Sequence, residues 1–332
     1  MCLVSVLMST YNESELELRL AIESILNQTY RNIEFIIVSD NPQNTMLQNI
    51  INEYQKKDRR IKVILNNENL GLPRSLNKGI EQARGKYIAR MDADDISLPN
   101  RIEEEMDFML INNLDMVAAL QINIDENNKT IEKKPLARMT PEDVNYLLPH
   151  SCFIAHPSVI FKKSTVIKLG GYRNITPAQD YDLWLRMISH GYRIGVLDKF
   201  LIKHRIRALS ISRKNIYKQI LTSNYLQNAY KNNTLNRDED IIIREVSEYL
   251  ANNSHNNILY RNKFNIAYNI FTKGINEIKN KHILKGLYKV GMAAFINRKC
   301  RLVILHLVKY KLLYQLRFGR VISRKDYHST CN

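Results

Sequence analysis

The segment KYIARMDADDISLPNR, residues 86–101, decides the fold class of this chain. Residues 86–91 are a short apolar run, which predicts a buried strand. Three carboxylates follow at once, within residues 92–95, and residues 100–110 then have the apolar spacing of a helix. The segment therefore predicts a strand that ends in an acidic loop and is followed by a helix, as in α/β proteins.

The same alternation continues on both sides of this segment. Further strands are predicted at residues 3–8, 34–39, 61–65 and 116–120, with helices at 15–27, 44–55 and 73–83. This order favours a doubly wound, mostly parallel sheet flanked by helices. Ligands bind beyond the carboxyl ends of the strands in such sheets, so we expect loops 9–12, 40–44 and 92–95 to lie together.

The second half of the chain changes character twice. Strands are predicted at residues 159–162 and 193–197, and helices at 164–169 and 181–190. From about residue 214 the sequence is rich in Asn, Lys and Tyr and has helical spacing throughout. We therefore predict two domains, an α/β domain at 1–213 and a helical, basic C-terminal region at 214–332.

The positive charge of the chain is concentrated near its C-terminus. The 332 residues carry a net charge of +16, and the segment from Lys273 to the end supplies +12 of it, with fourteen Lys or Arg and two acids. Such a balance suggests an anionic partner, which can be nucleic acid, a membrane surface or a phosphorylated substrate. No RRM, KH or zinc signature is present, so we expect no nucleic acid.

Several other classes of protein are disfavoured. The four cysteines form no CxxC pair, which indicates the reduced thiols of a cytosolic protein. The N-terminus lacks a basic region before its apolar run, and no stretch of about 18 uncharged apolar residues occurs, so we expect neither a signal peptide nor a membrane span. The motifs GxGxxG, GxxxxGK[ST] and GxSxG are absent.

The acidic loop is the sharpest local signal. Asp92, Asp94 and Asp95 form a cluster of hard oxygen ligands, and Mg²⁺ or Mn²⁺ prefers one or two carboxylates together with substrate phosphates. Such a metal would neutralise a diphosphate as it becomes a leaving group. The alternative interpretation is an acidic turn that caps the helix near Asn100.

A second acidic group occurs in QDYDLW, residues 179–184. One of its carboxylates could be a general base that takes a proton from an attacking hydroxyl. Alternatively, Asp180 is the N-cap of the following helix and Asp182 merely favours the helix dipole. Trp184, the only tryptophan, is assigned to the core or to a stacking surface.

Polar residues also follow the first two predicted strands. Asp40 could accept hydrogen bonds from a base or a ribose, or it could open an Asx-turn. Thr10, Tyr11 and Asn12 offer an aromatic face and polar groups for a base. For His156 a zinc site is disfavoured, because no acidic or cysteine partner stands at ligand spacing.

Taken in order, these motifs resemble the family 2 glycosyltransferases, which have the GT-A fold. The resemblance is carried by SVLMSTYNE at residues 5–13, by residues 69–101 from NLGLPR to the acidic loop, and by residues 155–186 from AHPSVIF to QDYDLWLR. It extends over about residues 3–213. It implies inverting transfer of a sugar from a nucleotide diphosphate-sugar donor.

The resemblance also implies roles for individual residues. Thr10, Tyr11 and Asp40 would lie at the nucleotide, and we assign Asn12 and Arg74 to the same donor site. In the acidic loop Asp94 is implied as the metal ligand of a DxD pair, with Asp92 nearer the ribose. Asp180 occupies the position of the catalytic base. The acceptor side is assigned to His156, in the His-Pro turn of the family, and to Asp182 and Trp184.

In three places the chain departs from its relatives. Gln179 and Ser39 each stand where many relatives have an acid. Arg207 stands where relatives often have a His, within an Arg-x-His-x-x-Ser pattern that corresponds to residues 205–210. Arginine cannot ligate a cation, but Arg207 could pair with the diphosphate of the donor.

The C-terminal region contains the segment RLVILHLVKYKLLYQL, residues 301–316. Its length and charges predict an amphipathic helix on an anionic membrane surface, and the alternative is an ordinary helical subdomain with a solvated basic face. We expect an enzyme at the inner face of the cytoplasmic membrane that uses a glycan or lipid-linked glycan acceptor in cell-surface polysaccharide synthesis.

Two other functions are weighed against this one. A sugar nucleotidyltransferase would need a Gly-rich, basic loop after the first strand, and residues 9–13 lack it. The second is a non-catalytic, membrane-tethered nucleotide-sugar-binding or scaffold protein.

Overall fold

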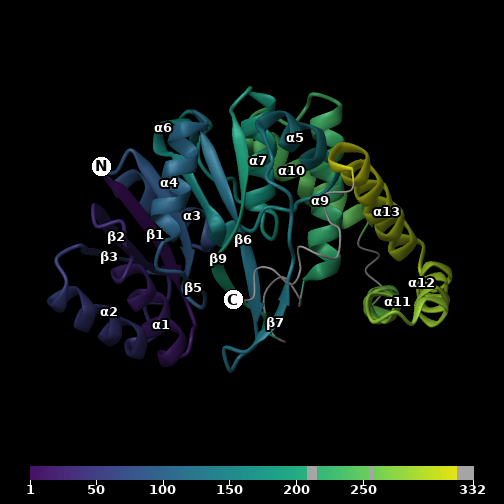
Figure 1. Cartoon of the computed structure of the whole chain (residues 1–332), viewed down its shortest axis with the longest axis horizontal. Coiled ribbons are helices and arrows are strands. Elements are labelled where there is room, and N and C mark those ends of the chain that lie inside the picture. The colour runs from purple at the N-terminus through teal and green to yellow at the C-terminus, as the bar shows by residue number, and fades with distance from the viewer. Residues whose placement is uncertain (208–214, 254–257, 320–332) are drawn as a thin grey trace. The chain divides into compact units, whose positions relative to one another are not determined.

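A computed structural model describes residues 1–207, 215–253 and 258–319 of the chain (Figure 1). The chain divides into two compact units. The α/β unit comprises Met1–Tyr146 and Cys152–Arg213, and the helical unit comprises Leu147–Ser151 and Lys214–Asn332.

The sheet of the α/β unit begins with four parallel strands. Their order is β3 (Ile61–Leu65), β2 (Ile33–Ser39), β1 (Val4–Thr10) and β4 (Tyr87–Asp92). Thr10 at the end of β1 is level with Ser39 of β2, and Ser9 is level with Asp92 of β4. The carboxyl ends of β1, β2 and β4 therefore lie at one edge of the sheet.

The rest of the sheet is mixed. Strand β8 (Val159–Lys162) is antiparallel to both β4 and β6 (Met116–Ile124), and β9 (Ile194–Arg205) is parallel to β6. Two short strands, β5 (Ile96–Ser97) and β7 (Thr130–Lys133), pair antiparallel with β9 and β6. Because β5 follows the acidic loop directly, its pairing with β9 brings the end of β9 to that loop.

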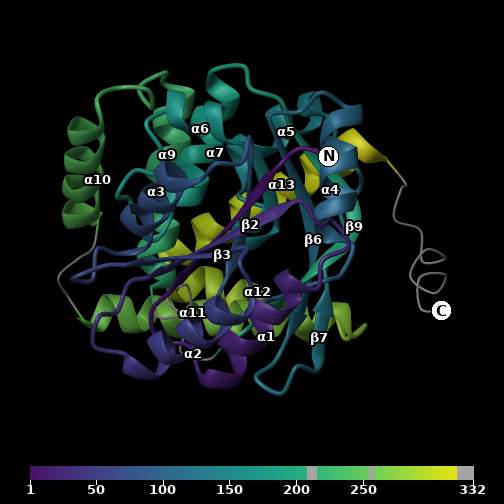
Figure 2. The ribbon, with the colours of Figure 1, turned by 90° about the vertical axis from the view of Figure 1, so that its left-hand side faces the viewer.

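Helices cover both faces of the sheet (Figures 1 and 2). They are α1 (Glu15–Leu26), α2 (Thr45–Lys57), α3 (Leu72–Gln82), α4 (Arg101–Ile111), α5 (Pro141–Leu147), the short 3-10 helix η2 (His156–Ser158), α6 (Lys163–Lys168) and α7 (Gln179–Ser189). Val6 and Met8 of β1 belong to the core that α1, α2 and α4 complete. Leu7 faces the other way, where Gly79 of α3 lets that helix approach closely, since a Cβ atom there would lie 2.2 Å from Leu7. Strand β1 is thus buried on both faces, as a central parallel strand requires.

The helical unit contains η1 (Leu148–His150), α9 (Ile216–Lys231), α10 (Glu239–Asn253), α11 (Ile258–Lys279), α12 (Ile283–Ile296) and α13 (Arg298–Phe318). Its core is a small cluster that includes Tyr217, Phe264, Phe271, Ala293 and Ile304. Among the residues that the structure describes, no helix combines the length and the apolar character needed to cross a bilayer.

The predicted fold class is confirmed, but two element boundaries differ from the prediction. Strand β9 continues to Arg205, beyond the predicted end at residue 197, because the exposed Asp198 and Lys199 interrupt the apolar run while pairing resumes after a register shift. Helix α7 begins at Gln179, so Asp180 lies inside its first turn and Ala178 is the N-cap residue. The interpretation of Asp180 as an N-cap is therefore wrong.

Candidate active site

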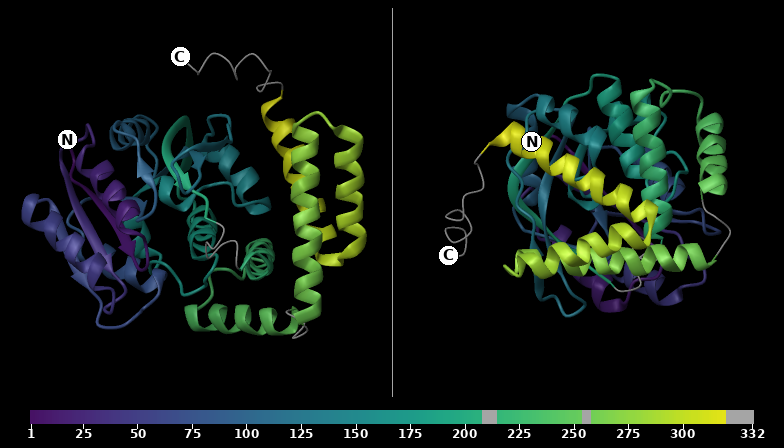
Figure 3. Two further views of the ribbon diagram at one scale, coloured as in Figure 1. Left: turned by 90° about the horizontal axis from the view of Figure 1, so that it is seen from below. Right: turned by 90° about the vertical axis from the view of Figure 1, so that its right-hand side faces the viewer.

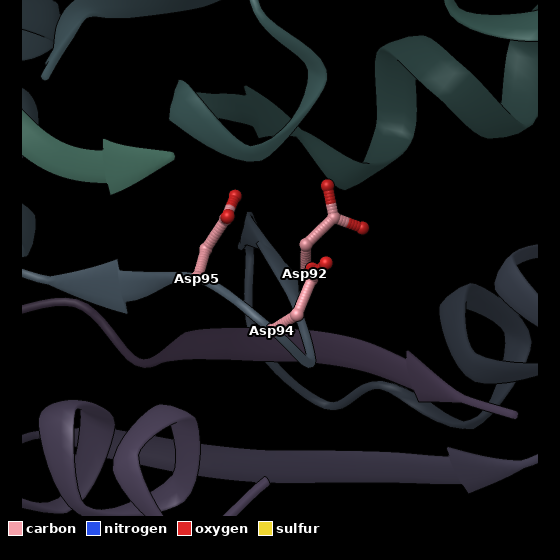
Figure 4. A group of neighbouring side chains, drawn as sticks. All are labelled: Asp92, Asp94 and Asp95. Carbon is pink, nitrogen blue, oxygen red and sulfur yellow. The ribbon is translucent and has the colours of Figure 1, made fainter. Parts of the chain in front are cut away.

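The acidic loop is a turn between β4 and β5. Asp92 ends β4, and Asp94 and Asp95 follow in the turn. One oxygen of each carboxylate lies within 4.8 Å of the others, and the three side chains project to the same side of the turn (Figure 4). Oxygen ligands of this number and kind fit a hard divalent cation such as Mg²⁺ or Mn²⁺.

The end of β9 holds this turn in place. Asp95 is fully buried, and its Oδ1 accepts a hydrogen bond from the backbone N–H of Arg205 at 2.8 Å. Nε of Arg205 in turn donates to the carbonyl oxygen of Asp94 at 2.8 Å. Burial opposes the charging of His204, but Asp95 at 3.3 Å from its Nδ1 raises the pKa of that imidazole to about 9. Asp95 therefore braces the turn against β9, and the interpretation of the acidic turn as a cap for the helix at Asn100 is wrong.

Arg207 lies beside Asp94. Its Nη2 is 3.2 Å from Oδ2 of Asp94 and 3.0 Å from Oε2 of Glu17 on α1. Burial, followed by the carboxylates of Asp95 and Asp92, raises the pKa of Asp94 to about 8, and the charge of Arg207 opposes this rise. A divalent cation would relieve the crowding of negative charge, so the residues present fit a bound metal. Residues 208–210 of the predicted Arg-x-His-x-x-Ser pattern lie outside the described residues.

A buried arginine lies behind the turn. Arg90 is two residues before Asp92, on the same side of β4, and its Nη1 forms an ion pair with Oδ1 of Asp92. The charge of Arg90 also acts on Asp180, His156 and Tyr172. The end of β4 and the start of α7 therefore belong to one electrostatic environment.

Asp180 lies in the first turn of α7. Burial raises the pKa of its carboxyl, the backbone N–H groups of Tyr181 and of Asp180 itself oppose the rise, and Asp92 adds to it. A carboxylate with a raised pKa is a better proton acceptor than an ordinary one, which suits a general base.

Aromatic side chains line the interior near Asp180. Nε2 of His156 lies 3.0 Å from the hydroxyl oxygen of Tyr172, and its ring packs edge-on against Trp184. Burial, helped by Arg90, lowers the pKa of His156 well below its usual range, so this imidazole is neutral at pH 7. Nε1 of Trp184 is buried and makes no hydrogen bond within the described part of the chain.

Asp182 has a different setting. Its side chain is fully buried, Oδ2 accepts a hydrogen bond from Nε of Arg186 at 2.9 Å, and Oδ1 lies 3.5 Å from Nη1 of Arg173. Arg186 also donates to two carbonyl oxygens of the segment before α7. Asp182 thus anchors α7 to that segment. Its role is therefore larger than the favourable interaction with the helix dipole that the sequence suggests.

Asp40, which follows β2, orders the loop that leads into α3. This buried carboxylate accepts hydrogen bonds from Nδ2 of Asn66 at 2.8 Å and from the backbone N–H groups of Leu70 and Gly71, both at 2.9 Å. The Asx-turn at this position is formed by the next residue, Asn41, so that alternative for Asp40 is wrong.

The other residues predicted for the donor lie at the surface of the same edge or just below it. Thr10 is buried, and its hydroxyl donates to Glu13. Tyr11 is 46% exposed, and Asn12 and Arg74 are also exposed, the latter in the first turn of α3. Tyr11, Asn12 and Arg74 are therefore accessible to a nucleotide.

Four contributors to the site were not predicted from the sequence: Glu17, Arg90, Tyr172 and His204. Strand alternation could have identified Arg90, because it puts that residue on the same side of β4 as Asp92. The other three depend on contacts between elements far apart in the chain.

The fold has a match among solved structures. The structure is similar to that of residues 1–349 of S. aureus TarS in complex with UDP-GlcNAc, with a TM-score of 0.54 and 19% identity, over 77% of this chain and 75% of that chain. At this identity the likeness shows the fold alone, which is the GT-A fold of glycosyltransferases.

Sequence comparison gives the family. Residues 5–170 match the profile of Glycosyl transferase family 2. An uncharacterized glycosyltransferase of Methanocaldococcus jannaschii is 42% identical over 233 residues, 69% of this chain and 80% of that protein. The O-antigen biosynthesis glycosyltransferase WbnJ of Escherichia coli is 32% identical over 235 residues, 70% of this chain and 91% of WbnJ. The chain belongs to glycosyl transferase family 2, and its acidic turn fits the DxD motif.

Proposed function

We propose that this glycosyltransferase moves a sugar from a nucleotide diphosphate-sugar to a hydroxyl of a glycan or lipid-linked glycan, with inversion at the anomeric carbon. One observation carries the proposal: Asp92, Asp94 and Asp95 gather at the end of β4, where one oxygen of each carboxylate lies within 4.8 Å of the others. Such a cluster supports a diphosphate leaving group held through a divalent cation.

The donor side comprises the loops after β1 and β2 and the first turn of α3. The exposed ring of Tyr11 offers a face for the base, and Arg74 offers a cation in reach of solvent. Asp40 keeps the loop before α3 ordered through its three hydrogen bonds. Thr10 and Asn12 complete the proposed nucleotide site.

Asp92 and Asp94 would hold Mg²⁺ or Mn²⁺, with Asp95 bracing the turn. A bound divalent cation supplies neutralisation of the diphosphate as it leaves. Arg207 can pair with the same diphosphate, because its guanidinium already lies at the turn and forms bidentate bonds with phosphate readily.

Asp180 accepts the proton of the acceptor hydroxyl. The hydroxyl oxygen then attacks the anomeric carbon on the face opposite the diphosphate, the bond to the diphosphate breaks, and the configuration inverts. Positioning and charge stabilisation contribute most of the rate gain. His156 and Trp184 form the proposed acceptor side, and Asp182 keeps α7 in position.

We further place the enzyme at the inner face of the cytoplasmic membrane, in the synthesis of a cell-surface polysaccharide. The name of its relative WbnJ refers to O-antigen biosynthesis. The basic helical unit would contact anionic lipid, toward which each Lys or Arg near the surface contributes about 1 kcal/mol. No nucleic-acid partner is proposed.

A donor screen tests this function. A panel of UDP-, GDP- and dTDP-sugars, with and without Mn²⁺, is scored by thermal shift and by release of nucleoside diphosphate. We expect one donor to stabilise the protein in the presence of metal and to be hydrolysed slowly. If no donor shifts the melting temperature under either condition, the proposal fails and the non-catalytic scaffold function becomes the better account.

A further inference from the structure

Helix α12 exposes three of its large apolar side chains and buries two of its small residues. Leu284 is 84% exposed, Tyr288 is 69% exposed and Phe295 is 93% exposed, whereas Gly286 and Ala293 are buried. The three large residues lie at i, i+4 and i+11, so they share one face of the helix. A helix that packs onto a protein core in water has the opposite arrangement, with its large apolar residues inside.

The orientation of α12 is fixed by a close contact with α11. A Cβ atom at Gly286 would lie 2.7 Å from the carbonyl oxygen of Gly274, and one at Gly274 would lie 2.9 Å from the carbonyl oxygen of Gly286. The two helices therefore approach backbone to backbone, and they run side by side (Figure 3). Small residues between helices, with large apolar residues outside, are the arrangement of helices that face lipid. The large apolar residues of α12 are thus exposed because its small residues face α11.

The charges around this helix pair are nearly all positive. The acid of the α11–α12 segment, Glu277, is engaged by Lys289 at 2.6 Å, Lys285 at 3.1 Å and His282 at 3.0 Å. The side chain of Lys285 is 65% exposed, and this residue is next to Leu284 in the exposed stretch of α12. A second copy of the chain would bring like charges together, whereas an anionic surface complements them.

The dimensions of α12 exclude a crossing of the bilayer. Its 14 residues span roughly 21 Å at the rise of an α-helix, which is short of the about 30 Å of the hydrocarbon core. An amphipathic helix of this length lies in the plane of the interface, with its apolar face in the upper acyl region.

We propose that the face of α12 formed by Leu284, Tyr288 and Phe295 inserts into the headgroup–acyl boundary of an anionic bilayer. This inference deepens the membrane contact of the proposed function and rests on it. It assigns that contact to α12, which lies outside the segment 301–316 that the sequence indicates.

The first test is flotation with lipid vesicles. Wild type, the double variant Leu284→Glu/Phe295→Glu and the control Ile111→Glu are mixed with phosphatidylcholine vesicles, with or without phosphatidylglycerol. Ile111 is 83% exposed on α4, which belongs to the α/β unit, so its substitution matches the chemistry of the double variant on the other unit. We expect wild type and control to float with the anionic vesicles, and the double variant to partition about tenfold less for each side chain removed.

Two results of this test would overturn the proposal: a wild type that stays at the bottom of the gradient, or a double variant that floats as wild type does. Because the substituted side chains are exposed, we expect unchanged circular dichroism and melting temperature. Sedimentation of the wild type and the double variant without lipid gives a further check. A dimer that dissociates in the double variant would show that a second copy covers this face.

The second test reports depth. Phe295→Trp is titrated with anionic vesicles that carry brominated acyl chains, and Ile111→Trp is the control. The native Trp184 is buried and serves as a constant background. Insertion is supported if the tryptophan fluorescence of Phe295→Trp is quenched and that of Ile111→Trp is not. Insertion is contradicted if the fluorescence of Phe295→Trp is not quenched. Release of nucleoside diphosphate is measured in parallel without lipid, so that a failed transferase function is distinguished from a failed membrane surface.

Discussion

The guanidinium of Arg207 lies 3.2 Å from the carboxylate of Asp94. A permanent positive charge therefore lies beside the turn that would hold a divalent cation. Arg207 and a bound metal would compete for the carboxylate of Asp94. Their like charges, a few ångströms apart in a partly buried site, would also repel each other by several kcal/mol. The same guanidinium is placed to meet the diphosphate of the donor.

This relationship predicts opposite effects of Arg207→Gln on metal binding and on turnover. At a pH at which Asp94 is ionised, removing the competing charge should tighten Mn²⁺ binding about tenfold, whereas loss of the pairing with diphosphate should slow transfer about tenfold or more. Mn²⁺ binding is measured by electron paramagnetic resonance of the free ion, and turnover by release of nucleoside diphosphate.

Two controls accompany Arg207→Gln. Arg207→Lys keeps the charge and should bind Mn²⁺ nearly as wild type does. Arg138→Gln removes an arginine from an exposed pair with Asp198 and should change neither quantity. Weaker binding of Mn²⁺ to Arg207→Gln would show that the arginine builds the metal site and does not compete with the metal.

Much of this site follows from local sequence pattern. The edge of the sheet at which Thr10, Asp40 and Asp92 lie was predictable, because parallel strands bring their carboxyl ends to the same edge. Strand and helix periods were enough to find these loops. The order of motifs was enough to identify the family.

The contacts that support the acidic turn could not be predicted in this way. His204 and Arg205 reach Asp95 only because β9 continues past Asp198 and pairs with β5. That continuation depends on the neighbouring strand, since the local sequence turns polar where β9 goes on. Similarly, the local preference of Asp for N-cap positions misplaced Asp180, because α7 begins at Gln179 with Ala178 as its N-cap residue.

Asp40→Ala should loosen the loop before α3 and weaken donor binding. The substitution leaves Asn66 and the backbone N–H groups of Leu70 and Gly71 without their shared acceptor, which costs about 1–3 kcal/mol for a buried group. We expect a lower melting temperature and about tenfold weaker donor affinity by calorimetry. The control is Asn69→Ala, which removes an exposed acceptor of the same Gly71 N–H and should have little effect. Equal losses in both variants would contradict the role assigned to Asp40.

Asp182→Ala should destabilise the α/β unit much more than an exposed carboxylate would. It leaves the buried guanidinium of Arg186 without its charge partner, which typically costs about 3–5 kcal/mol. The matched variant Asp198→Ala breaks an exposed pair with Arg138, which is expected to cost about 1 kcal/mol at most. Urea unfolding of the two variants measures the difference in free energy of unfolding. Similar midpoints would mean that Asp182 does not anchor α7.

Asp180→Asn should slow transfer strongly while leaving the fold and the donor site intact. A positioned general base typically contributes about 10²–10⁴-fold to a rate, so we expect a loss of about 10³-fold in the release of nucleoside diphosphate that depends on the acceptor. Donor affinity, measured by thermal shift, should stay near that of wild type. A variant that keeps its turnover would assign the proton transfer to another group.

The pH dependence of transfer gives a sharper test of the same carboxyl. Burial raises the pKa of Asp180 above its ordinary value of 3.8, and only the ionised form can accept a proton. The value of kcat/KM should therefore be constant at high pH and fall tenfold per pH unit as the pH drops below the pKa of Asp180 in the folded enzyme. Saturating Mn²⁺ keeps Asp94 ionised, so the titration of Asp94 does not add a second fall to the pH profile of kcat/KM. Asp180→Glu should retain some activity with a displaced acid limb, whereas the residual activity of Asp180→Asn should lose that limb. An acid limb at the same pH in wild type and in Asp180→Asn would mean that a different group controls the reaction.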